Sequence, residues 1–349
     1  MELIHTFLNL AAPPFTFLSL LFFLLPFQIF KFFLSVLGTL FSEDIAGKVV
    51  LITGASSGIG ESLAYEYAKH GACLVLAARR EGSLREVAER ARDLGSPDVI
   101  IVQADVSKVD DCRRVVDQTM NHFGRLDHLV NNAGVTSIAM LEEIHDVNDF
   151  RAVMDTNFWG FVYMTRFAVP YLRNSGGRIV VLSSSASWLP APRMSFYNAS
   201  KAAISQFFET LRVEFGPDIG ITLVTPGYIE SELTQGKFFN REGKLEVDQE
   251  MRDVQVNLMP ILNVGSCAKA IVRGAIRGER YVTEPAWFRV TYLWKLFFPE
   301  VVEYTLRFMS MTRPGEPSRE ALGKKLMDYT GVKSVLYPET MQGTEPKRD

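Results

Sequence analysis

A glycine-rich turn between a short buried strand and a helix is the feature that most restricts the fold of this chain. Residues 48–52 form an apolar, β-branched run typical of a strand buried on both faces of a parallel sheet. The turn occupies residues 53–60, and an amphipathic helical pattern covers residues 61–70. Residues 72–78 form a second apolar run. This strand–turn–helix–strand unit predicts an α/β fold around a parallel sheet.

The glycines of the turn have the spacing G-x-x-x-G-x-G, from Gly54 through Gly58 to Gly60. Gly54 permits a tight turn, Gly58 lets the backbone approach a pyrophosphate, and Gly60 lets the helix pack closely on the strand. The first N–H groups of the helix, at its positive dipole end, favour an anionic ligand. The turn therefore predicts a dinucleotide site. The other expected cofactor contacts within the turn are Ser56, Ser57 and Ile59.

The residues at the end of the second strand indicate which dinucleotide is bound. NAD sites usually carry a carboxylate about 20 residues after the glycines, where it binds the ribose 2′-hydroxyl. This chain has Arg79 and Arg80 there. A guanidinium suits a 2′-phosphate because it forms charge-assisted, bidentate hydrogen bonds. The sequence therefore favours NADP(H), with Arg79 and Arg80 as ligands, although the adjacent Glu81 leaves NAD(H) as the alternative.

The alternation of strands and helices continues along the chain. It predicts one doubly wound parallel sheet, with polar residues at the carboxyl ends of its strands, where such sheets bind ligands. The further expected strands are residues 99–102, 126–130, 177–182 and 219–224, and the further expected helices are 108–123, 150–172 and 196–215.

A tyrosine and a lysine one helical turn apart are the candidate catalytic pair. Tyr197 and Lys201 are at positions i and i+4, so they share one face of the expected helix. A free tyrosine has a pKa near 10, and a neighbouring ammonium is expected to lower it. Tyr197 could then exchange a proton with an alcohol or ketone oxygen. Ser184 lies 13 residues upstream, at the end of an expected strand.

Taken together, these motifs resemble those of the short-chain dehydrogenase/reductase family, which has a Rossmann-type fold. The motifs are Thr53-Gly54-x-x-x-Gly58-x-Gly60, Asn131-Asn132-Ala133-Gly134, Ser184, Tyr197-x-x-x-Lys201 and Pro226-Gly227. The resemblance covers about residues 45–285 and implies hydride transfer between a nicotinamide and a carbonyl or alcohol carbon.

The same resemblance implies a role for each site residue. Tyr197 is expected to be the general acid/base, and Lys201 to lower its pKa and bind the nicotinamide ribose. Ser184 is expected to bind the substrate oxygen, and Asn157 to support a proton-relay water. Asp105 is expected to contact the adenine. The other expected cofactor contacts are Asn132, Ala133, Gly134 and Pro226.

The first 41 residues have a different character from the rest of the chain. They contain 10 of the 25 phenylalanines, and residues 7–30 include no Asp, Glu, Lys or Arg. About 20 apolar residues suffice to cross a bilayer, so we expect a membrane or lipid-droplet anchor. Pro13, Pro14 and Pro26 each remove a helix donor. We therefore favour a hairpin that returns on the same side over a kinked spanning helix or a buried core segment.

Within the family, the sequence resembles the steroleosins, the hydroxysteroid-dehydrogenase-like proteins of plant oil bodies, and also the 11-beta-hydroxysteroid dehydrogenases. The resemblance to steroleosins includes the proline-containing apolar segment and residues 226–232 and 281–288. It implies an NADP(H)-dependent reaction on a steroid or sterol at the lipid-droplet surface, with the endoplasmic reticulum as the alternative location. The alternative functions are reduction of a retinoid or long-chain ketone, and a coat protein with secondary dehydrogenase activity.

The remaining sequence suggests three regions. Residues 1–42 form the anchor, 43–285 the NADP-binding catalytic domain, and 286–349 an extension. We favour a homodimer contact for the extension, with membrane contact or packing on the domain as alternatives. Residues 228–262 are expected to form a lid over the substrate. An apolar wall of the substrate pocket is expected from Trp188, Leu189, Phe196 and Tyr228.

Charge and metal-binding residue types exclude other function classes. The formal net charge is −3, which gives no electrostatic basis for nucleic-acid binding. The three cysteines form no C-x-x-C motif, and the five histidines lack metal-ligand spacing. We therefore expect neither a metal site nor a disulfide framework.

Overall fold

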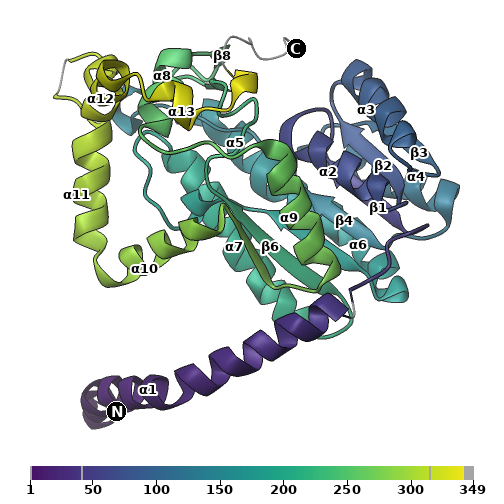
Figure 1. The fold of residues 1–349 in the computed structure, drawn as a ribbon, viewed down its shortest axis with the longest axis horizontal. Helices are drawn as coiled ribbons and strands as arrows, with labels where there is room; N and C mark the ends of the chain where they lie inside the picture. The colour runs from purple at the N-terminus through teal and green to yellow at the C-terminus, as the bar shows by residue number, and fades with distance from the viewer. Residues whose placement is uncertain (1, 41, 314–315, 342–349) are drawn as a thin grey trace.

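A computed structural model describes residues 2–40, 42–313 and 316–341 of the chain. Its centre is a seven-stranded parallel sheet in the order β3-β2-β1-β4-β5-β6-β9 (Figure 1). The expected doubly wound parallel sheet is confirmed. The strands are β1 (Val49–Thr53), β2 (Cys73–Ala78), β3 (Val99–Gln103), β4 (His128–Asn131), β5 (Arg178–Leu182), β6 (Gly220–Pro226) and β9 (Tyr281–Glu284).

Helices cover both faces of this sheet, which is why β1 is buried over its whole length. One core cluster joins the sheet to α2 (Gly58–Lys69), α3 (Glu81–Asp93) and α9 (Val264–Ile276). A second cluster, on the opposite face, joins it to α4 (Val109–Phe123), α6 (Gly160–Ser175) and α7 (Ser195–Phe215).

The order of the strands places the ligand-binding edge. Strand β1 pairs with β2 on one side and with β4 on the other, so the direction of winding reverses at β1. In open α/β sheets this reversal leaves a crevice at the carboxyl ends of the strands. The glycine-rich turn follows β1 directly, and Ser184 follows β5.

Two parts of the α/β domain differ from the expected elements. The expected helix 150–172 is divided into α5 (Arg151–Met154), a π-helical turn (Asp155–Trp159) and α6. The edge strand β9 and helix α3 lie outside the elements expected from the sequence. The short 3₁₀ segments are Leu141–Glu143, Val147–Phe150, Ser185–Ser187, Ala286–Phe288, Ser318–Glu320 and Glu339–Met341.

The insertion between β6 and α9 is ordered and packs on the domain. It contains the hairpin β7 (Lys237–Phe239) and β8 (Leu245–Val247), followed by α8 (Gln249–Val256). The Phe239 N–H donates to the carbonyl of Thr136, and the Ile138 N–H donates to the carbonyl of Phe239. The hairpin is therefore attached to the loop that follows β4.

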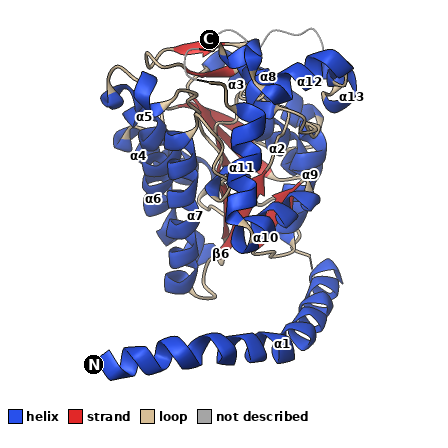
Figure 2. Ribbon diagram, turned by 90° about the vertical axis from the view of Figure 1, so that its left-hand side faces the viewer, coloured by secondary structure: helices blue, strands red, loops and turns tan. Residues whose placement is uncertain are grey.

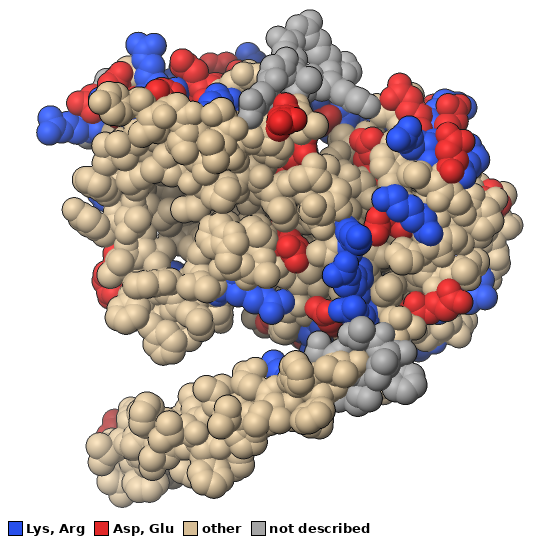
Figure 3. All heavy atoms as spheres, in the orientation of Figure 1, with Lys and Arg blue, Asp and Glu red and all other residues tan. Residues whose placement is uncertain are grey.

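The N-terminal segment is one helix, α1 (Glu2–Leu40), with all three prolines inside it. The favoured hairpin is absent from this structure. A proline removes one hydrogen bond and kinks a helix, but its fixed φ still fits helical geometry. Figure 2 shows α1 bending while remaining continuous, and Figure 3 shows its surface as almost free of charged side chains. Residues Glu2–Phe33 are long and apolar enough to cross a membrane.

The C-terminal region contains α10 (Arg289–Phe297), α11 (Pro299–Ser310), α12 (Leu322–Thr330) and α13 (Lys333–Leu336). Met327 and Tyr337 pack against Val256 of α8, so the end of the region is joined to the insertion. In contrast, α10 and α11 expose large apolar side chains. These include Val290, Leu293, Trp294, Leu296, Phe297, Val301, Tyr304 and Phe308.

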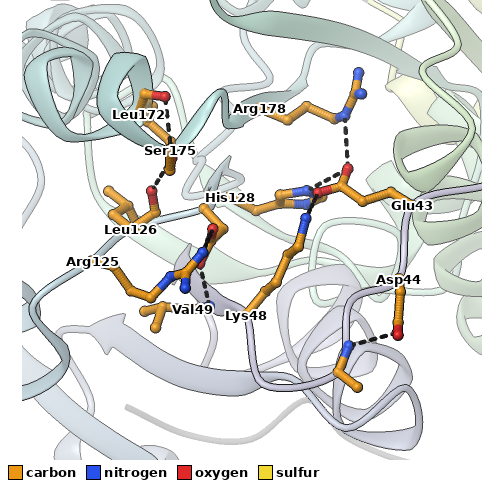
Figure 4. Close-up of polar contacts among 12 residues, drawn as sticks. Glu43, Asp44, Lys48, Val49, Arg125, Leu126, His128, Leu172, Ser175 and Arg178 are labelled. Atoms are coloured by element: carbon orange, nitrogen blue, oxygen red, sulfur yellow. Dashed lines mark hydrogen bonds and ion pairs between the residues drawn. The ribbon is translucent and has the colours of Figure 1, made fainter.

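A polar cluster holds Glu43, which lies three residues after the end of α1, against the sheet (Figure 4). The Glu43 carboxylate lies 3.3 Å from His128 Nε2 and 3.9 Å from Arg178 Nε, and it also pairs with Lys48. His128 is fully buried, and its Nδ1 lies 3.2 Å from the Tyr67 hydroxyl. Burial lowers the pKa of His128. A neutral imidazole fits both contacts, because Nε2 donates to the carboxylate while Nδ1 accepts from the hydroxyl.

Candidate active site

The glycine turn has the geometry that a bound dinucleotide requires. Gly54 and Gly58 have φ values of +65° and +58°, which favour glycine. A Cβ at Gly60 would lie 2.2 Å from the Gly54 carbonyl oxygen, so α2 approaches the turn as closely as backbone permits. Asn132 braces the turn, because its Nδ2 donates to the carbonyls of Thr53 (2.9 Å) and Gly54 (3.1 Å). The turn therefore fits a phosphate-bearing cofactor at the N-terminus of α2.

A cavity of about 330 Å³ runs along the carboxyl edge of the sheet. All the site residues expected from the sequence line it, except Gly60 and Asn157. Gly60 lies beneath the turn, and Asn157 lies behind Gly134. The lining residues from that set are Gly54, Ser56, Ser57, Gly58, Ile59, Arg79, Arg80, Asp105, Asn132, Ala133, Gly134, Ser184, Tyr197, Lys201 and Pro226.

The two arginines at the end of β2 have different surroundings. Arg79 is exposed, and no side-chain hydrogen bond of Arg79 is found among the described residues. Arg80 is partly buried, and its Nη2 donates to Ser57 Oγ (2.7 Å) and Ser56 Oγ (3.2 Å). Both arginines can reach an anion at this end of the cavity.

Asp105 lies in the same half of the cavity, after β3. Its Oδ1 accepts from the N–H (3.0 Å) and the hydroxyl (2.8 Å) of Ser107. These two contacts fix the carboxylate in a turn. It is therefore held rigidly beside the part of the cavity that the arginines border.

Ser184 and Tyr197 meet at the other end of the cavity. Tyr197 is in the first turn of α7 and is only 8% exposed. Burial raises its pKa, and a hydrogen bond with the Ser184 side chain partly opposes that shift. The flanking serine Ser183 instead bonds Ser205 (2.8 Å) and the Lys201 carbonyl (3.1 Å). Of these two serines, Ser184 is therefore the one that contacts the tyrosine.

Lys201 is buried beneath Tyr197. Its Nζ donates to the Leu182 carbonyl at the end of β5 (2.9 Å) and lies 5.6 Å from the centre of the Tyr197 ring. Burial lowers the pKa of Lys201 to about 7. The lysine is therefore only partly charged at neutral pH. In this structure, burial shifts both groups toward their neutral forms. That Lys201 lowers the pKa of Tyr197 stays a prediction.

Asn157 joins two loops behind the cavity. Its Nδ2 donates to the Val135 carbonyl (2.9 Å) and to Ser200 Oγ (3.0 Å), and its Oδ1 accepts from the Val135 N–H (2.8 Å). The π-helical turn Asp155–Trp159 aims this side chain inward, and such turns often occur at functional sites. Asn157 thus fixes the loop after β4 against α7.

The wall near Tyr197 is mostly apolar and agrees only partly with the expected set. Leu189 and Tyr228 line the cavity as expected. Trp188 and Phe196 do not, because Trp188 bonds Thr291 (3.0 Å) and Phe196 stacks on Phe150. The wall also includes Val135, Ile138, Met194, Val256, Phe288 and Leu306.

The insertion supplies site residues that the sequence patterns did not single out. Ser231, Glu232, Thr234 and Lys237 line the cavity beside the glycine turn. Ser231 lies close to the turn: a Cβ added at Gly58 would be 3.4 Å from the Cβ of Ser231. The sequence signals for this segment were the unusual length of the β6–α9 connection and, for residues 226–232, the resemblance to steroleosins.

Comparison with known proteins identifies the family. The family model described as short chain dehydrogenase matches residues 48–242. The chain belongs to the short-chain dehydrogenase family. It is therefore an oxidoreductase, as its motifs predict. The described residues contain no group of three or more His, Cys, Asp or Glu placed to hold a metal ion.

Two plant relatives match over the full length of this short-chain dehydrogenase. 11-beta-hydroxysteroid dehydrogenase A of Sesamum indicum is 78% identical over 349 residues, covering 100% of both chains. 11-beta-hydroxysteroid dehydrogenase 1A of Arabidopsis thaliana is 63% identical over 349 residues, again covering 100% of both chains. The resemblance to plant hydroxysteroid-dehydrogenase-like proteins is confirmed.

Solved structures of the same fold include two with a nicotinamide dinucleotide. A short chain dehydrogenase/reductase from Burkholderia phymatum in complex with NAD is 26% identical, with a TM-score of 0.64, covering 78% of this chain and 98% of that one. An alcohol dehydrogenase from Thermococcus sibiricus complexed with 5-hydroxy-NADP is 26% identical, with a TM-score of 0.56. The match covers 68% of this chain and 94% of that one.

Proposed function

We propose that the protein is an NADP(H)-dependent hydroxysteroid dehydrogenase that interconverts a secondary alcohol and a ketone on a steroid or sterol. The observation that carries this proposal is the continuous cavity. Its one end has the glycine turn with Arg79 and Arg80, and its other end has Ser184 and Tyr197 beside an apolar wall. A cavity with an apolar wall and few polar groups suits a bulky apolar substrate with one reacting oxygen.

The bound nicotinamide would supply or accept the hydride, and the side chains of the chain would handle the oxygen and its proton. The raised pKa of Tyr197 keeps its hydroxyl protonated at neutral pH, so it can donate a proton to a ketone oxygen and recover it in the reverse direction. Ser184 holds the same oxygen. Lys201 and Asn157 fix the tyrosine helix against β5 and the loop after β4.

The preference for NADP(H) rests on charge. Two guanidinium groups border the cavity at the end of β2, where NAD-specific members of such folds usually place a carboxylate. The glycine turn, Asp105 and the loop of Asn132, Ala133 and Gly134 would hold the rest of the cofactor. Pro226 would close the nicotinamide end.

The proposed location is the surface of lipid droplets, with the endoplasmic reticulum as the alternative. It is supported by the exposed apolar side chains along α1. Such an anchor would hold the cavity near apolar substrates dissolved in lipid.

We also propose a homodimer formed through the exposed apolar faces of α10 and α11. Sedimentation of the full chain in detergent tests this. Replacing Leu293 and Phe297 by Asp should convert a dimer to a monomer. A monomeric wild type would contradict the proposed homodimer.

The function is tested by hydride transfer with the purified full chain. We would supply NADPH, NADP, NADH and NAD in turn, with hydroxy- and ketosteroids, long-chain ketones and retinoids. Steroid turnover that depends on NADP(H) and is lost in Tyr197→Phe, with cofactor binding retained, would support the proposal. Turnover of retinoids alone would change the substrate class. Tight cofactor binding with no turnover would favour a coat-protein role.

A further inference from the structure

The guanidinium group of Arg80 already has an anionic partner within the chain. Its Nη1 donates to Glu232 Oε1 at 2.7 Å, while its Nη2 bonds the serine hydroxyls of the glycine turn. Glu232 belongs to the insertion, 152 residues away in the sequence. The ion pair therefore crosses the cavity from the end of β2 to the segment after β6.

The Glu232 carboxylate has a second cation beside it. Its Oε2 lies 3.5 Å from Lys237 Nζ, and the Lys237 N–H donates to the Glu232 carbonyl (3.0 Å). The side chains of Glu232 and Lys237 are only 20% and 10% exposed. A carboxylate that leaves Arg80 would thus remain paired, which reduces the free-energy cost of releasing it.

The Glu232 carboxylate and a 2′-phosphate cannot both bind the Arg80 guanidinium at full strength. A phosphate binds arginine best through two parallel N–H···O bonds, and Glu232 already occupies Nη1. A 2′-phosphate beside an undisplaced carboxylate would also experience like-charge repulsion. A cofactor with a 2′-hydroxyl at this position carries no such charge, so its binding does not require Glu232 to leave Arg80.

We propose that Glu232 is an internal counterion that competes with the 2′-phosphate of NADP(H) for Arg80 and so weakens the preference for the phosphorylated cofactor. The carboxylate shifts from Arg80 to Lys237 when the phosphate binds. Glu232 is therefore a specificity-determining residue, although it lies outside the glycine turn and the β2 end. This inference rests on the proposed use of NADP(H).

The test is the affinity of Glu232→Gln for ligands with and without a 2′-phosphate. We would titrate the full chain in detergent with NADPH, NADH, 2′,5′-ADP and 5′-AMP by calorimetry. We expect the variant to bind NADPH and 2′,5′-ADP about five- to tenfold more tightly than the wild type does. Its affinity for NADH and 5′-AMP should stay within about twofold, because these ligands do not displace the carboxylate.

Glu230→Gln is the matched control. It removes the same charge two residues away, but Glu230 bonds Asn263 and Thr340 instead of Arg80. It should leave all four affinities unchanged. A double-mutant cycle gives the second control, because Glu232→Gln should have no effect in an Arg80→Met background if the competition acts through Arg80.

The outcomes separate this inference from the proposed function. Unchanged or weaker binding of 2′,5′-ADP to Glu232→Gln overturns the inference even if the wild type prefers NADPH. Equal tightening of NADH and NADPH also overturns it, because the effect would then be independent of the 2′-phosphate. A wild type that binds NADH as well as NADPH overturns the cofactor proposal, while the 2′,5′-ADP comparison still tests Glu232.

Discussion

At the residue scale, Tyr197 and Lys201 form a buried pair in α7. Both side chains are under 10% exposed, and burial disfavours the charged form of each. The i, i+4 spacing gave their shared helix face. It carries no information on burial, which raises the pKa of Tyr197 in this structure.

The buried lysine should make the protein less stable at low pH. The pKa of Lys201 is about 7 in the fold against 10.5 for an ordinary lysine. The unfolded chain therefore binds more protons between these values, and stability rises with pH across that window. We expect Lys201→Met to raise the melting temperature relative to wild type more at pH 6 than at pH 9.5. Thermal melts of cofactor-free protein measure this.

The comparison uses the pH dependence because Lys201→Met also leaves the Leu182 carbonyl without its donor. That loss is the same at both pH values and cancels. Parallel pH profiles for the two proteins would contradict burial as the cause of the shifted lysine pKa.

At the element scale, contact between the glycine turn and α2 leaves no space for a side chain at Gly60. An added Cβ would lie 2.2 Å from the Gly54 oxygen and 2.4 Å from Asn132 Nδ2. We expect Gly60→Ala to lower the free energy of unfolding by about 2–3 kcal/mol and to abolish cofactor binding. A Cβ added at Gly82 would meet no atom within 4 Å, so Gly82→Ala should raise the free energy of unfolding by about 0.5 kcal/mol. Chemical denaturation measures the free energy of unfolding of each variant, and titration with cofactor measures binding.

The cluster around Glu43 should stabilise the domain in a pH-dependent way. Burial raises the pKa of Glu43, but hydrogen bonds from His128 and Lys48 and the charge of Lys48 outweigh it and hold the pKa at about 2, against an ordinary 4.5. Its contribution is therefore present above pH 4.5 and is lost as the pH falls toward 2. We expect Glu43→Gln to melt a few degrees below wild type at pH 7, with the difference shrinking from pH 4.5 downward.

Glu242→Gln is the control for this comparison, since Glu242 forms an exposed pair with Lys244 and such pairs contribute little. A constant difference between Glu43→Gln and wild type from pH 7 to pH 3 would show that the carboxylate charge is not the stabilising factor.

The elements that the sequence predicts and those it does not predict differ in how they are stabilised. The buried strands β1 and β2 are continuous apolar runs, so their composition identifies them. Strand β9 has only four residues, and its place depends on pairing with β6, including contact between Thr225 and Thr283 (2.9 Å). The contacts of Glu232 likewise join residues far apart in the sequence, and no local pattern encodes such a pair.

At the scale of the whole molecule, the continuous α1 changes what the prolines are expected to do. A hairpin needs them to turn the chain, whereas a bent helix does not. We expect a variant with Pro13, Pro14 and Pro26 replaced by Leu to float with phospholipid vesicles as the wild type does. Leu20→Arg with Phe23→Arg should greatly reduce flotation, since a charge at the centre of an apolar helix costs about 3 kcal/mol. Failure of the leucine variant to float would favour the hairpin in lipid.

The Glu43 contacts lie at the amino ends of β4 and β5, whereas the cavity lies along the carboxyl ends of the strands. The length of a five-residue strand, about 17 Å, separates the two edges. We therefore expect that exchanging the residues before Glu43 for another apolar segment leaves the reacting groups in place. The apolar N-terminal segment and the cavity would then be separable parts of this protein, and each could be altered by evolution or by design without rebuilding the other.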